Sequence, residues 1–377
     1  MSFSPLSCDL TRADVLRALA GSAMGLLAHG CRWCADDAAS RFAAAFRLLR
    51  SDVDGGLVTA GVLAADGCES AACGWRRFSR ERIPITVDSL FDVASVTKPL
   101  VAAAAARLVA AGRLDPNAPF TEYLPEHCLG KSCEVTVADL ATHASGFDNL
   151  DNYDDVRTME SSEAFFARFM QSRPERPRRR YFDYRCHNYI LLGFVLEAVS
   201  GKRLDVACRE LVFEPLGMRD TRWGPIANPV RVVEQSPAFV NTVNAPGVIN
   251  DERARFVARP IGNAGVYATA DDLLAFVSDL ARRQRFEKAY YDLLLTPSFS
   301  APSLVGGAWR MRSFGFDMTP DPSLTGYSAR AVRHSGFTGQ TVIADPDRAF
   351  AAVVLTSRNC DHRVGVRHRN RILSALV

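Results

Sequence analysis

Residues 91–111 have the sequence FDVASVTKPLVAAAAARLVAA. From Thr97 to Ala111 the side chains are almost all apolar, and Gly112 follows as a helix terminator. A helix that is apolar on all sides is buried on most of its surface, so this segment predicts a helix at the centre of the fold. Ser95 precedes the helix, and Lys98 follows one turn later on the same face. The fold is therefore expected to bury a lysine beside a serine.

The spacing of Ser95 and Lys98 suits nucleophilic catalysis. At a helix N-terminus, backbone N–H groups and the helix dipole favour the negative charge that develops during attack. Burial is expected to lower the pKa of Lys98 and so make it a better general base. The S-x-x-K spacing alone is common by chance, and its alternative interpretation is a helix cap beside a surface lysine. The apolar surroundings favour the catalytic interpretation.

Helices and strands are distributed unevenly around this segment. Helical patterns occur at residues 35–50, 137–142, 162–169, 189–199, 204–213, 270–281, 287–295 and 367–377. Strand patterns lie nearer the two ends, at residues 57–65, 72–78, 314–318, 341–344 and 349–356. The predicted fold class is α+β, of the α/β sandwich type. One antiparallel sheet is built from the N- and C-terminal segments, with flanking helices and an inserted, mainly helical region.

Length and charge set the broad organisation. A chain of 377 residues predicts two or three domains. We expect a sheet domain at residues 35–90 plus 300–377 and a mainly helical domain at residues 91–299, with the active site between them. The net charge of +3, from 45 basic and 42 acidic residues, gives no support for nucleic-acid binding. No apolar run reaches the ~18 to 20 residues of a membrane span.

Residues 1–34 have a different character from the rest. Residues 11–31 resemble a twin-arginine export signal that ends in a lipoprotein cleavage site, which implies a lipid anchor at Cys31. Two features depart from that pattern: Ala13 stands where the second arginine belongs, and His29 precedes the Gly-Cys pair. The alternative is an N-terminal amphipathic helix. An extracytoplasmic location is favoured over a cytoplasmic one.

Ten cysteines are an unusual number for such a chain. The Cys31–Cys34 pair is not followed by a second C-x-x-C, so a four-ligand zinc site is not expected. Two pairs share a five-residue spacing and form either small disulfide rings or free, partly buried thiols: Cys68 with Cys73, and Cys128 with Cys133. No nucleotide-binding loop or metalloprotease motif occurs, so neither a cofactor nor a metal is expected.

Two further stretches accompany the serine and lysine: Tyr184-Arg185-Cys186, and the segment from His334 to Gly339, on or beside a strand. In this order and at these separations, the motifs resemble the class C β-lactamase, penicillin-binding protein and esterase family of serine hydrolases. The resemblance covers roughly residues 35–375. Other matching stretches are LATHASGF at 140–147, FEPLGM at 213–218 and GVYATADDL at 265–273.

The resemblance implies a role for each motif. It makes Ser95 the nucleophile that forms an acyl-enzyme, and it gives the general-base and proton-shuttle work to Lys98 and Tyr184. The backbone N–H groups of Ser95 and Phe337 are expected to form the oxyanion hole. The substrate is expected to lie against four residues: His334, Ser335, Gly336 and Cys186.

Two positions depart from the family's motifs. The third motif is often Lys-Thr-Gly, but this chain has His334, which is only partly charged near neutral pH. The usual Tyr-x-Asn is replaced by a sequence ending in Cys186, whose thiol is a poor partner for a substrate amide. Both changes favour an ester or simple acyl substrate over a β-lactam. The alternative for Cys186 is a small buried filler at a helix start.

The sequence has three further candidates for the site: His143, the pair Asp251 and Glu252, and the arginines at 178–180. His143 is interpreted as a packed, hydrogen-bonded histidine and not as the partner of Ser95 in a triad. Asp251 and Glu252 are interpreted as part of a loop that lines the site, not as paired catalytic carboxylates. The arginines at 178–180 either form a solvated loop or stand at the cleft rim and favour anionic substrates.

The sequence therefore predicts an acyl-serine hydrolase that cleaves an ester or a D-amino-acid-type amide. The alternatives are a β-lactamase or D-Ala-D-Ala carboxypeptidase and, from another class, a non-catalytic sensor that binds muropeptides or β-lactams. The joint presence of Ser95, Lys98 and Tyr184 argues against the sensor. The expected partner is a small ester, amide or peptidoglycan-derived molecule, without nucleic acid and without a membrane span.

Overall fold

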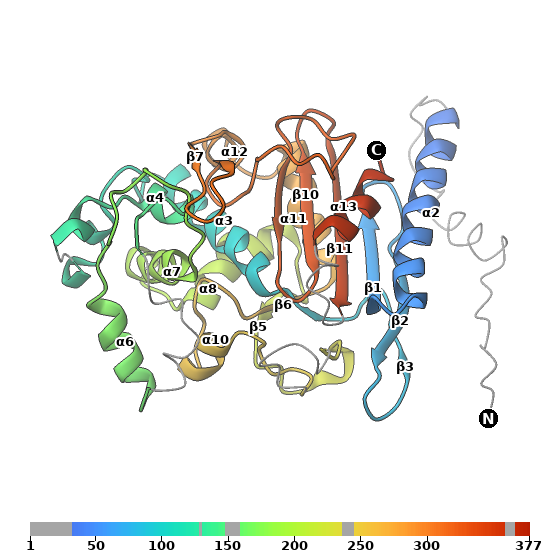
Figure 1. Cartoon of the computed structure of the whole chain (residues 1–377), viewed down its shortest axis with the longest axis horizontal. Helices are drawn as coiled ribbons and strands as arrows, with labels where there is room; N and C mark the ends of the chain where they lie inside the picture. The colour runs from blue at the N-terminus through green and yellow to red at the C-terminus, as the bar shows by residue number, and fades with distance from the viewer. Residues whose placement is uncertain (1–31, 128–129, 148–158, 236–244, 359–365) are drawn as a thin grey trace.

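The computed structural model describes residues 32–127, 130–147, 159–235, 245–358 and 366–377 (Figure 1). The predicted export signal and the candidate anchor at Cys31 lie outside the described residues. The first described element is helix α2 (Arg32–Asp54), which confirms the helix expected at residues 35–50. No helix in the described ranges is long and apolar enough to span a membrane.

One antiparallel sheet joins the two ends of the chain. Its six strands run in the order β3-β2-β1-β11-β10-β9. Strand β1 pairs with β11 from Val58 opposite Arg358 to Ala65 opposite Ala352, so the first long strand lies beside the last. This pairing confirms the predicted sheet built from both terminal segments. The strands are β1 (Val58–Ala65), β2 (Ala71–Arg77), β3 (Ile83–Pro84), β9 (Val332–Ser335), β10 (Gln340–Asp345) and β11 (Phe350–Arg358).

Helices cover both faces of this sheet. Helices α2 and α13 (Val366–Ser374) pack together on one face, and α11 (Ala270–Arg282) packs on the other (Figure 1). Neighbouring residues of β1 enter opposite layers: Leu63 packs with Leu49 of α2, whereas Val62 joins the cluster that contains Phe276 of α11. Because both faces are covered, the central strands are continuously apolar and do not alternate with polar residues.

The helical region surrounds α3 (Thr97–Ala110), which is almost wholly buried, as the sequence predicts. It packs against α7 (Cys186–Ser200) and α12 (Lys288–Leu295). A small sheet in the order β4-β6-β5 and the hairpin β7–β8 complete the framework of the site. The remaining elements are α4 (Val137–Ala141), α6 (Ser162–Met170), α8 (Leu204–Cys208), α9 (Glu214–Leu216), α10 (Glu252–Val257), β4 (Phe91–Asp92), β5 (Arg222–Trp223), β6 (Val266–Ala268), β7 (Phe299–Pro302) and β8 (Trp309–Arg312).

One predicted strand is wrong. Residues 314–316 form a bend and Asp317 makes only isolated bridges with Arg312 and Arg333, so no strand forms, although Phe314 and Phe316 are fully buried. Between them, Gly315 has a φ of 106°, and a Cβ there would lie 2.6 Å from the Cβ of Ala102 on α3. The backbone therefore passes so close to α3 that only glycine fits. The apolar alternation from Phe314 to Phe316 therefore reflects packing, and backbone pairing begins only at Asp317.

The cysteine pairs behave differently. Cys68 and Cys73 are free, partly buried thiols, so of the two alternatives for this pair the free thiols are confirmed and the disulfide ring is not formed. Burial, followed by the charge of Asp54, raises the pKa of Cys73 to about 12, which makes this thiol unreactive. Cys133 is disulfide-bonded. Its expected partner, Cys128, lies outside the described residues.

Candidate active site

Ser95 lies in a short turn, Ala94–Val96, between strand β4 and helix α3. The turn begins with Ala94 at a φ of 45°, a left-handed conformation that is costly for a residue with a side chain. The buried carboxylate of Asp92 accepts the N–H of Ala94 at 2.9 Å and the N–H of Asn250 at 2.7 Å. These two bonds hold the strained turn in place and so fix where Ser95 begins the helix.

Lys98 is fully buried and reaches three groups at once. Its Nζ donates a 2.9 Å hydrogen bond to Ser95 Oγ and another of 2.9 Å to the main-chain oxygen of Asn263. The Sγ of Cys186 lies 3.6 Å from Nζ, and the centroid of the Tyr184 ring lies 5.0 Å from it. The predicted contact between the lysine and the serine is therefore present.

The direction of the lysine's pKa differs from the expectation. Burial alone would lower the pKa of Lys98, but Cys186, Tyr184 and Asp251 outweigh it, and the net pKa is raised. Only burial can be judged from the apolar sequence around the lysine, because its three partners are distant in the chain. In the resting site, Lys98 is therefore an ammonium group that donates to Ser95 and is not a free base.

Tyr184 lies just before α7, and its side chain is 40% exposed, so a substrate can reach it. Its ring centroid lies 4.3 Å from that of His143 and 6.3 Å from that of His334. The Nδ1 of His143 accepts the main-chain N–H of Arg185 at 3.2 Å. Burial, followed by the charges of Arg312 and Lys98, holds the pKa of His143 well below its ordinary value. His143 is thus a neutral packing partner of Tyr184, as interpreted from the sequence.

The third motif is held against the serine turn by close packing. A Cβ on Gly336 would lie 2.5 Å from the main-chain oxygen of Val93, so only glycine allows this approach. Thr338 Oγ1 donates a 2.8 Å hydrogen bond to the main-chain oxygen of Asp92 and also contacts Gln340 Oε1 at 2.6 Å. The turn that carries Phe337 is therefore locked to the segment that carries Ser95.

His334 is buried in strand β9, and its Nδ1 lies 3.1 Å from the main-chain oxygen of Ser335. Burial, followed by the charges of Arg312 and Lys98, holds the pKa of His334 well below its ordinary value. It is a neutral group at pH 7. Tyr184, His334 and Ser335 line a cavity of about 830 Å³, which extends along β8, the loop at 317–323 and the start of α13.

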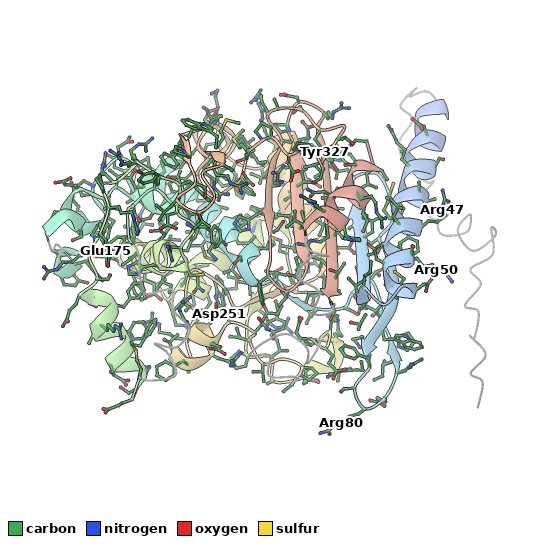
Figure 2. All side chains as sticks on the ribbon, viewed as in Figure 1. Arg47, Arg50, Arg80, Glu175, Asp251 and Tyr327 are labelled. Carbon is green, nitrogen blue, oxygen red and sulfur yellow. The ribbon has the colours of Figure 1, made fainter. Side chains whose placement is uncertain are left out.

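Asp251 stands behind the lysine and not in the cleft as one of a carboxylate pair. It is labelled at the start of α10 in Figure 2. One oxygen of Asp251 caps α10 through the N–H of Ala254 at 2.9 Å, and the other accepts from Asn263 Nδ2 at 3.2 Å. The main-chain oxygen of Asn263 accepts from Lys98, so Asn263 contacts both Asp251 and the lysine that donates to Ser95. Glu252 instead lies 4.0 Å from Arg255.

Two of the three arginines at 178–180 bind a buried carboxylate. Arg178 lies 2.9 Å from one oxygen of Asp139, and Arg179 lies 3.2 Å from the other. Arg179 also donates to the main-chain oxygen of Ser298 at 2.8 Å. All three arginines are exposed, which agrees with the solvated loop, and the side chains of Arg178 and Arg179 also tie that loop to α4.

Several groups of the site were missed from the sequence: Asp92, Asn263, Arg312 and Thr338. Asp92 had a local signal, because it lies three residues before Ser95. The others carry none, since each acts through a contact with a residue far away in the chain.

A strained serine turn, a buried lysine bonded to the serine and an accessible tyrosine define a serine acyl-transfer enzyme. The chain belongs to the Beta-lactamase family, whose model matches residues 46–376. It is a serine hydrolase, in agreement with the resemblance stated from the motifs.

The relatives of this chain are named for different activities. Esterase EstB of Burkholderia gladioli is 30% identical over 312 residues, which cover 73% of this chain and 79% of EstB. N-acetylmuramyl-L-alanine amidase of Bacillus subtilis (strain 168) is 25% identical over 305 residues, 72% of this chain and 68% of the amidase. Among solved structures, EstCE1, a hydrolase with promiscuous acyltransferase activity, matches with a TM-score of 0.75 and 20% identity. That match covers 91% of this chain and 99% of EstCE1, and it confirms the predicted fold class.

Proposed function

We propose that Ser95 is the nucleophile of an acyl-serine hydrolase that cleaves a carboxylic ester through a covalent acyl-enzyme. The observation that carries this proposal is the 2.9 Å hydrogen bond from the fully buried Nζ of Lys98 to Ser95 Oγ. Burying an ammonium group costs several kcal/mol, so a buried lysine that contacts a serine is expected to have a role that offsets this cost. Activation of the serine provides that role.

Lys98 and Tyr184 act as one proton-accepting pair. An ammonium group on Lys98 and a neutral phenol on Tyr184 cannot accept the proton of Ser95. One of the two residues must therefore release a proton before the attack. Because the pKa of Lys98 is raised despite burial, the lysine keeps its proton. Tyr184, whose ring centroid lies 5.0 Å from Lys98 Nζ, is the remaining member of the pair that can accept. Lys98 then orients Ser95 and supports the negative charge, while the Tyr184 oxygen accepts the proton.

During attack, the Ser95 proton passes to the Tyr184 oxygen, the bond from Oγ to the carbonyl carbon forms, and an electron pair moves onto the carbonyl oxygen. The N–H groups of Ser95 and Phe337 are proposed to hold that oxyanion. When the carbonyl re-forms, the leaving alkoxide takes the proton from Tyr184. Water repeats the sequence on the acyl-enzyme, and the acid is released.

Two features support an ester over a β-lactam. His334 is neutral and so supplies no fixed charge at the third motif, and the Sγ of Cys186 lies against Lys98, where a substrate amide would find only a weak partner. The identity of 30% with an esterase agrees with this ranking. The second candidate is a D-amino-acid-type amide, which the likeness to a putative D-alanyl-D-alanine carboxypeptidase of Escherichia coli (strain K12) supports.

Intact-protein mass spectrometry tests the proposal. The wild type and Ser95→Ala are each mixed with p-nitrophenyl hexanoate, a D-Ala-D-Ala peptide, benzylpenicillin and a cephalosporin. We expect an acyl adduct on the wild type alone, and a kcat/KM for the ester above that for benzylpenicillin. An adduct of equal yield on Ser95→Ala would refute the nucleophile, and faster turnover of penicillin would reverse the ranking.

A further inference from the structure

Asp251 is linked to the catalytic lysine through one residue, Asn263. The main-chain oxygen of Asn263 accepts Lys98 Nζ at 2.9 Å, and its Nδ2 donates to Asp251 at 3.2 Å. Asn263 is fully buried, and its Oδ1 forms no hydrogen bond within the described residues. In that part of the chain, Asp251 is therefore the partner that holds the side chain of Asn263.

Packing holds the main chain of Asn263 independently of Asp251. A Cβ on the preceding residue, Gly262, would lie 2.0 Å from the main-chain oxygen of Tyr189 on α7, so only glycine allows the turn to pack there. Because this contact does not involve Asp251, a change of the Asp251 side chain should leave the bond from Lys98 to the main chain of Asn263 in place. What Asp251 adds at the lysine is then chiefly its negative charge.

Asp251 forms no ion pair within the described residues. Its two oxygens accept N–H groups, from Ala254 and Asn263. The nearby Arg255 donates through Nη1 to two main-chain oxygens of the segment before α10, both at 2.7 Å, and its Nη2 lies 4.0 Å from Glu252. The negative charge of Asp251 is therefore not neutralised by an adjacent cation and can act on the lysine behind Asn263.

The three groups that favour the charged form of Lys98 differ in kind. Burial lowers the pKa of Lys98, whereas Cys186, Tyr184 and Asp251 raise it, and the net pKa is raised. Thiols and phenols are ordinarily protonated at neutral pH, whereas a carboxylate is charged there. Among the three, Asp251 therefore supplies the negative charge that is present throughout the neutral range.

Four other charged or titratable groups lie near Lys98 and Asp251: His143, His334, Asp92 and Arg255. Burial, followed by the charges of Arg312 and Lys98, keeps both histidines neutral by lowering their pKa. Burial, with a smaller contribution from Asp251, raises the pKa of Asp92 to about 6, and Arg255 opposes this rise. Removal of the charge of Asp251 therefore acts on Asp92 in the acid range and on Lys98 in the alkaline range, so the two effects can be measured apart.

We propose that Asp251 is a positioning residue of the active site, which keeps Lys98 in the ammonium form that donates to Ser95 in the resting enzyme. The inference rests on the proposed function and names the residue that sets the pH range in which the site works. A carboxylate one residue away from Lys98 attracts the ammonium charge without accepting a hydrogen bond from it. The donors of Lys98 therefore stay available to Ser95 and Asn263.

Asp251→Asn tests this role, because asparagine caps a helix well and keeps one acceptor oxygen but carries no charge. Loss of the negative charge favours loss of a proton from the pair of Lys98 and Tyr184. The acidic limb of kcat/KM for p-nitrophenyl hexanoate should therefore move to lower pH by about 0.5–1.5 units. A purely structural role of Asp251 would instead lower the rate at every pH without moving the limb. Asp251→Glu restores the charge and should return the limb toward its wild-type position.

Asp272→Asn is the matched control. Asp272 lies in the first turn of α11, where one of its oxygens accepts the N–H of Asp220 at 2.9 Å and the hydroxyl of Thr221 at 2.8 Å. The control thus removes a hydrogen-bonded carboxylate at the start of another helix. We expect it to move the acidic limb by less than about 0.2 units, because distant charges are screened. A shift as large as that of Asp251→Asn would overturn the proposal.

Trace acetylation measures the charge of Lys98 without turnover. The chain has only four lysines: Lys98, Lys131, Lys202 and Lys288. Acetic anhydride reacts with the neutral amine, and a fall of one unit in the pKa of an ammonium group gives about ten times more neutral amine at a lower pH. Measurement at pH 9 lies well above the titration of Asp92. The exposed Lys202 and Lys288 serve as internal references in the peptide mass spectra.

Relative to these references, acetylation of Lys98 should rise about 3- to 30-fold in Asp251→Asn and less than about two-fold in Asp272→Asn. If Asp251→Asn fails to fold, Asp251→Ser takes its place, since serine also caps a helix. An unmoved acidic limb together with no rise in the acetylation of Lys98 overturns the proposal. Failure of the proposed function differs from this result: no ester then acylates Ser95, and acetylation of Lys98 alone decides the role of Asp251.

Discussion

The hydroxyl of Thr338 donates a 2.8 Å hydrogen bond to the main-chain oxygen of Asp92. These residues are 246 positions apart, and the bond joins the turn after β9 to the strand before the serine. The N–H groups of Ser95 and Phe337, which we propose to form the oxyanion hole, are attached to these two segments. The distance between the two donors therefore depends on this bond.

Thr338→Val should lower kcat with little change in KM, since the oxyanion donors matter most in the transition state. Loss of the buried hydrogen bond should also cost about 1–3 kcal/mol of stability. Steady-state kinetics and thermal melts measure both effects. The control is Thr59→Val, which removes a 3.1 Å bond to the main-chain oxygen of Ser357 in the sheet. A loss of kcat in the control as large as that in Thr338→Val would contradict the argument.

Lys98→Ala and Tyr184→Phe should each lower kcat by several orders of magnitude, and the double variant should be little worse than either. The reason is that groups which share one proton transfer are strongly non-additive. Ester turnover by the two single variants and the double variant forms the required cycle. Losses that multiply would show that the two residues act independently.

The stability of the protein should depend on pH through Asp92. Burial raises the pKa of Asp92 from 3.8 to about 6, against the opposing effect of the N–H bonds from Asn250 and Ala94. The folded state therefore holds this proton more tightly than the unfolded state, so Asp92 costs stability as pH rises from about 4 to above 6. The cost is on the order of 3 kcal/mol at pH 7.

Asp92→Asn, which does not titrate, isolates this effect. The stability of the wild type minus that of Asp92→Asn should fall as pH rises from 4 to 7, measured by urea unfolding at each pH. Asparagine keeps one acceptor oxygen for the two N–H groups of Ala94 and Asn250, so loss of the other should lower the activity of the variant at every pH. A stability difference that stays constant with pH would show that Asp92 has an ordinary pKa.

The thiol of Cys186 should be alkylated by iodoacetamide with loss of ester hydrolysis. The Sγ of Cys186 lies 3.6 Å from Lys98 Nζ, which also donates to Ser95, so an adduct on the thiol would block the serine. Peptide mass spectrometry should find the modification at Cys186, and Cys186→Ser should keep its activity during the treatment. Cys208 is an internal reference, because burial raises its pKa and leaves it inert. Unchanged activity with Cys186 fully alkylated would place the thiol away from the reaction.

Cys186→Asn tests the substrate argument directly. If residue 186 faces the substrate, the side-chain amide of the new asparagine should raise the amide-to-ester rate ratio. The expected gain corresponds to about 0.5–1.5 kcal/mol, the contribution of one hydrogen bond. The rate ratio and the Tm are measured together. A lowered Tm with an unchanged ratio would show that Cys186 only packs against Lys98.

The sequence predicted those parts of the site that depend on local geometry. Ser95 and Lys98 are one helical turn apart, so their contact follows from the helix itself. The pKa of Lys98 was predicted in the wrong direction, because Cys186 and Asp251 reach it from distant segments. Arg312 carried no signal for the same reason.

The fold class could be predicted because apolar patterns at both ends of the chain differ from those in the middle. The details failed where a pattern had another cause, as at residues 314–316, where Gly315 passes close to α3 and Phe316 stacks on Phe276 of α11. The short strands β4, β5 and β6 have only two or three residues each, too few to show a period.

The pairing of β1 with β11 has a consequence for synthesis of the protein. Val58 finds its partner, Arg358, only 300 positions later in the chain. At about 5–20 residues per second, the ribosome needs roughly 15–60 s to supply that partner. During this interval β2 can pair with one edge of β1, while the other edge stays open to strands of other chains. The nascent protein is therefore most prone to aggregation while its helical region is already complete.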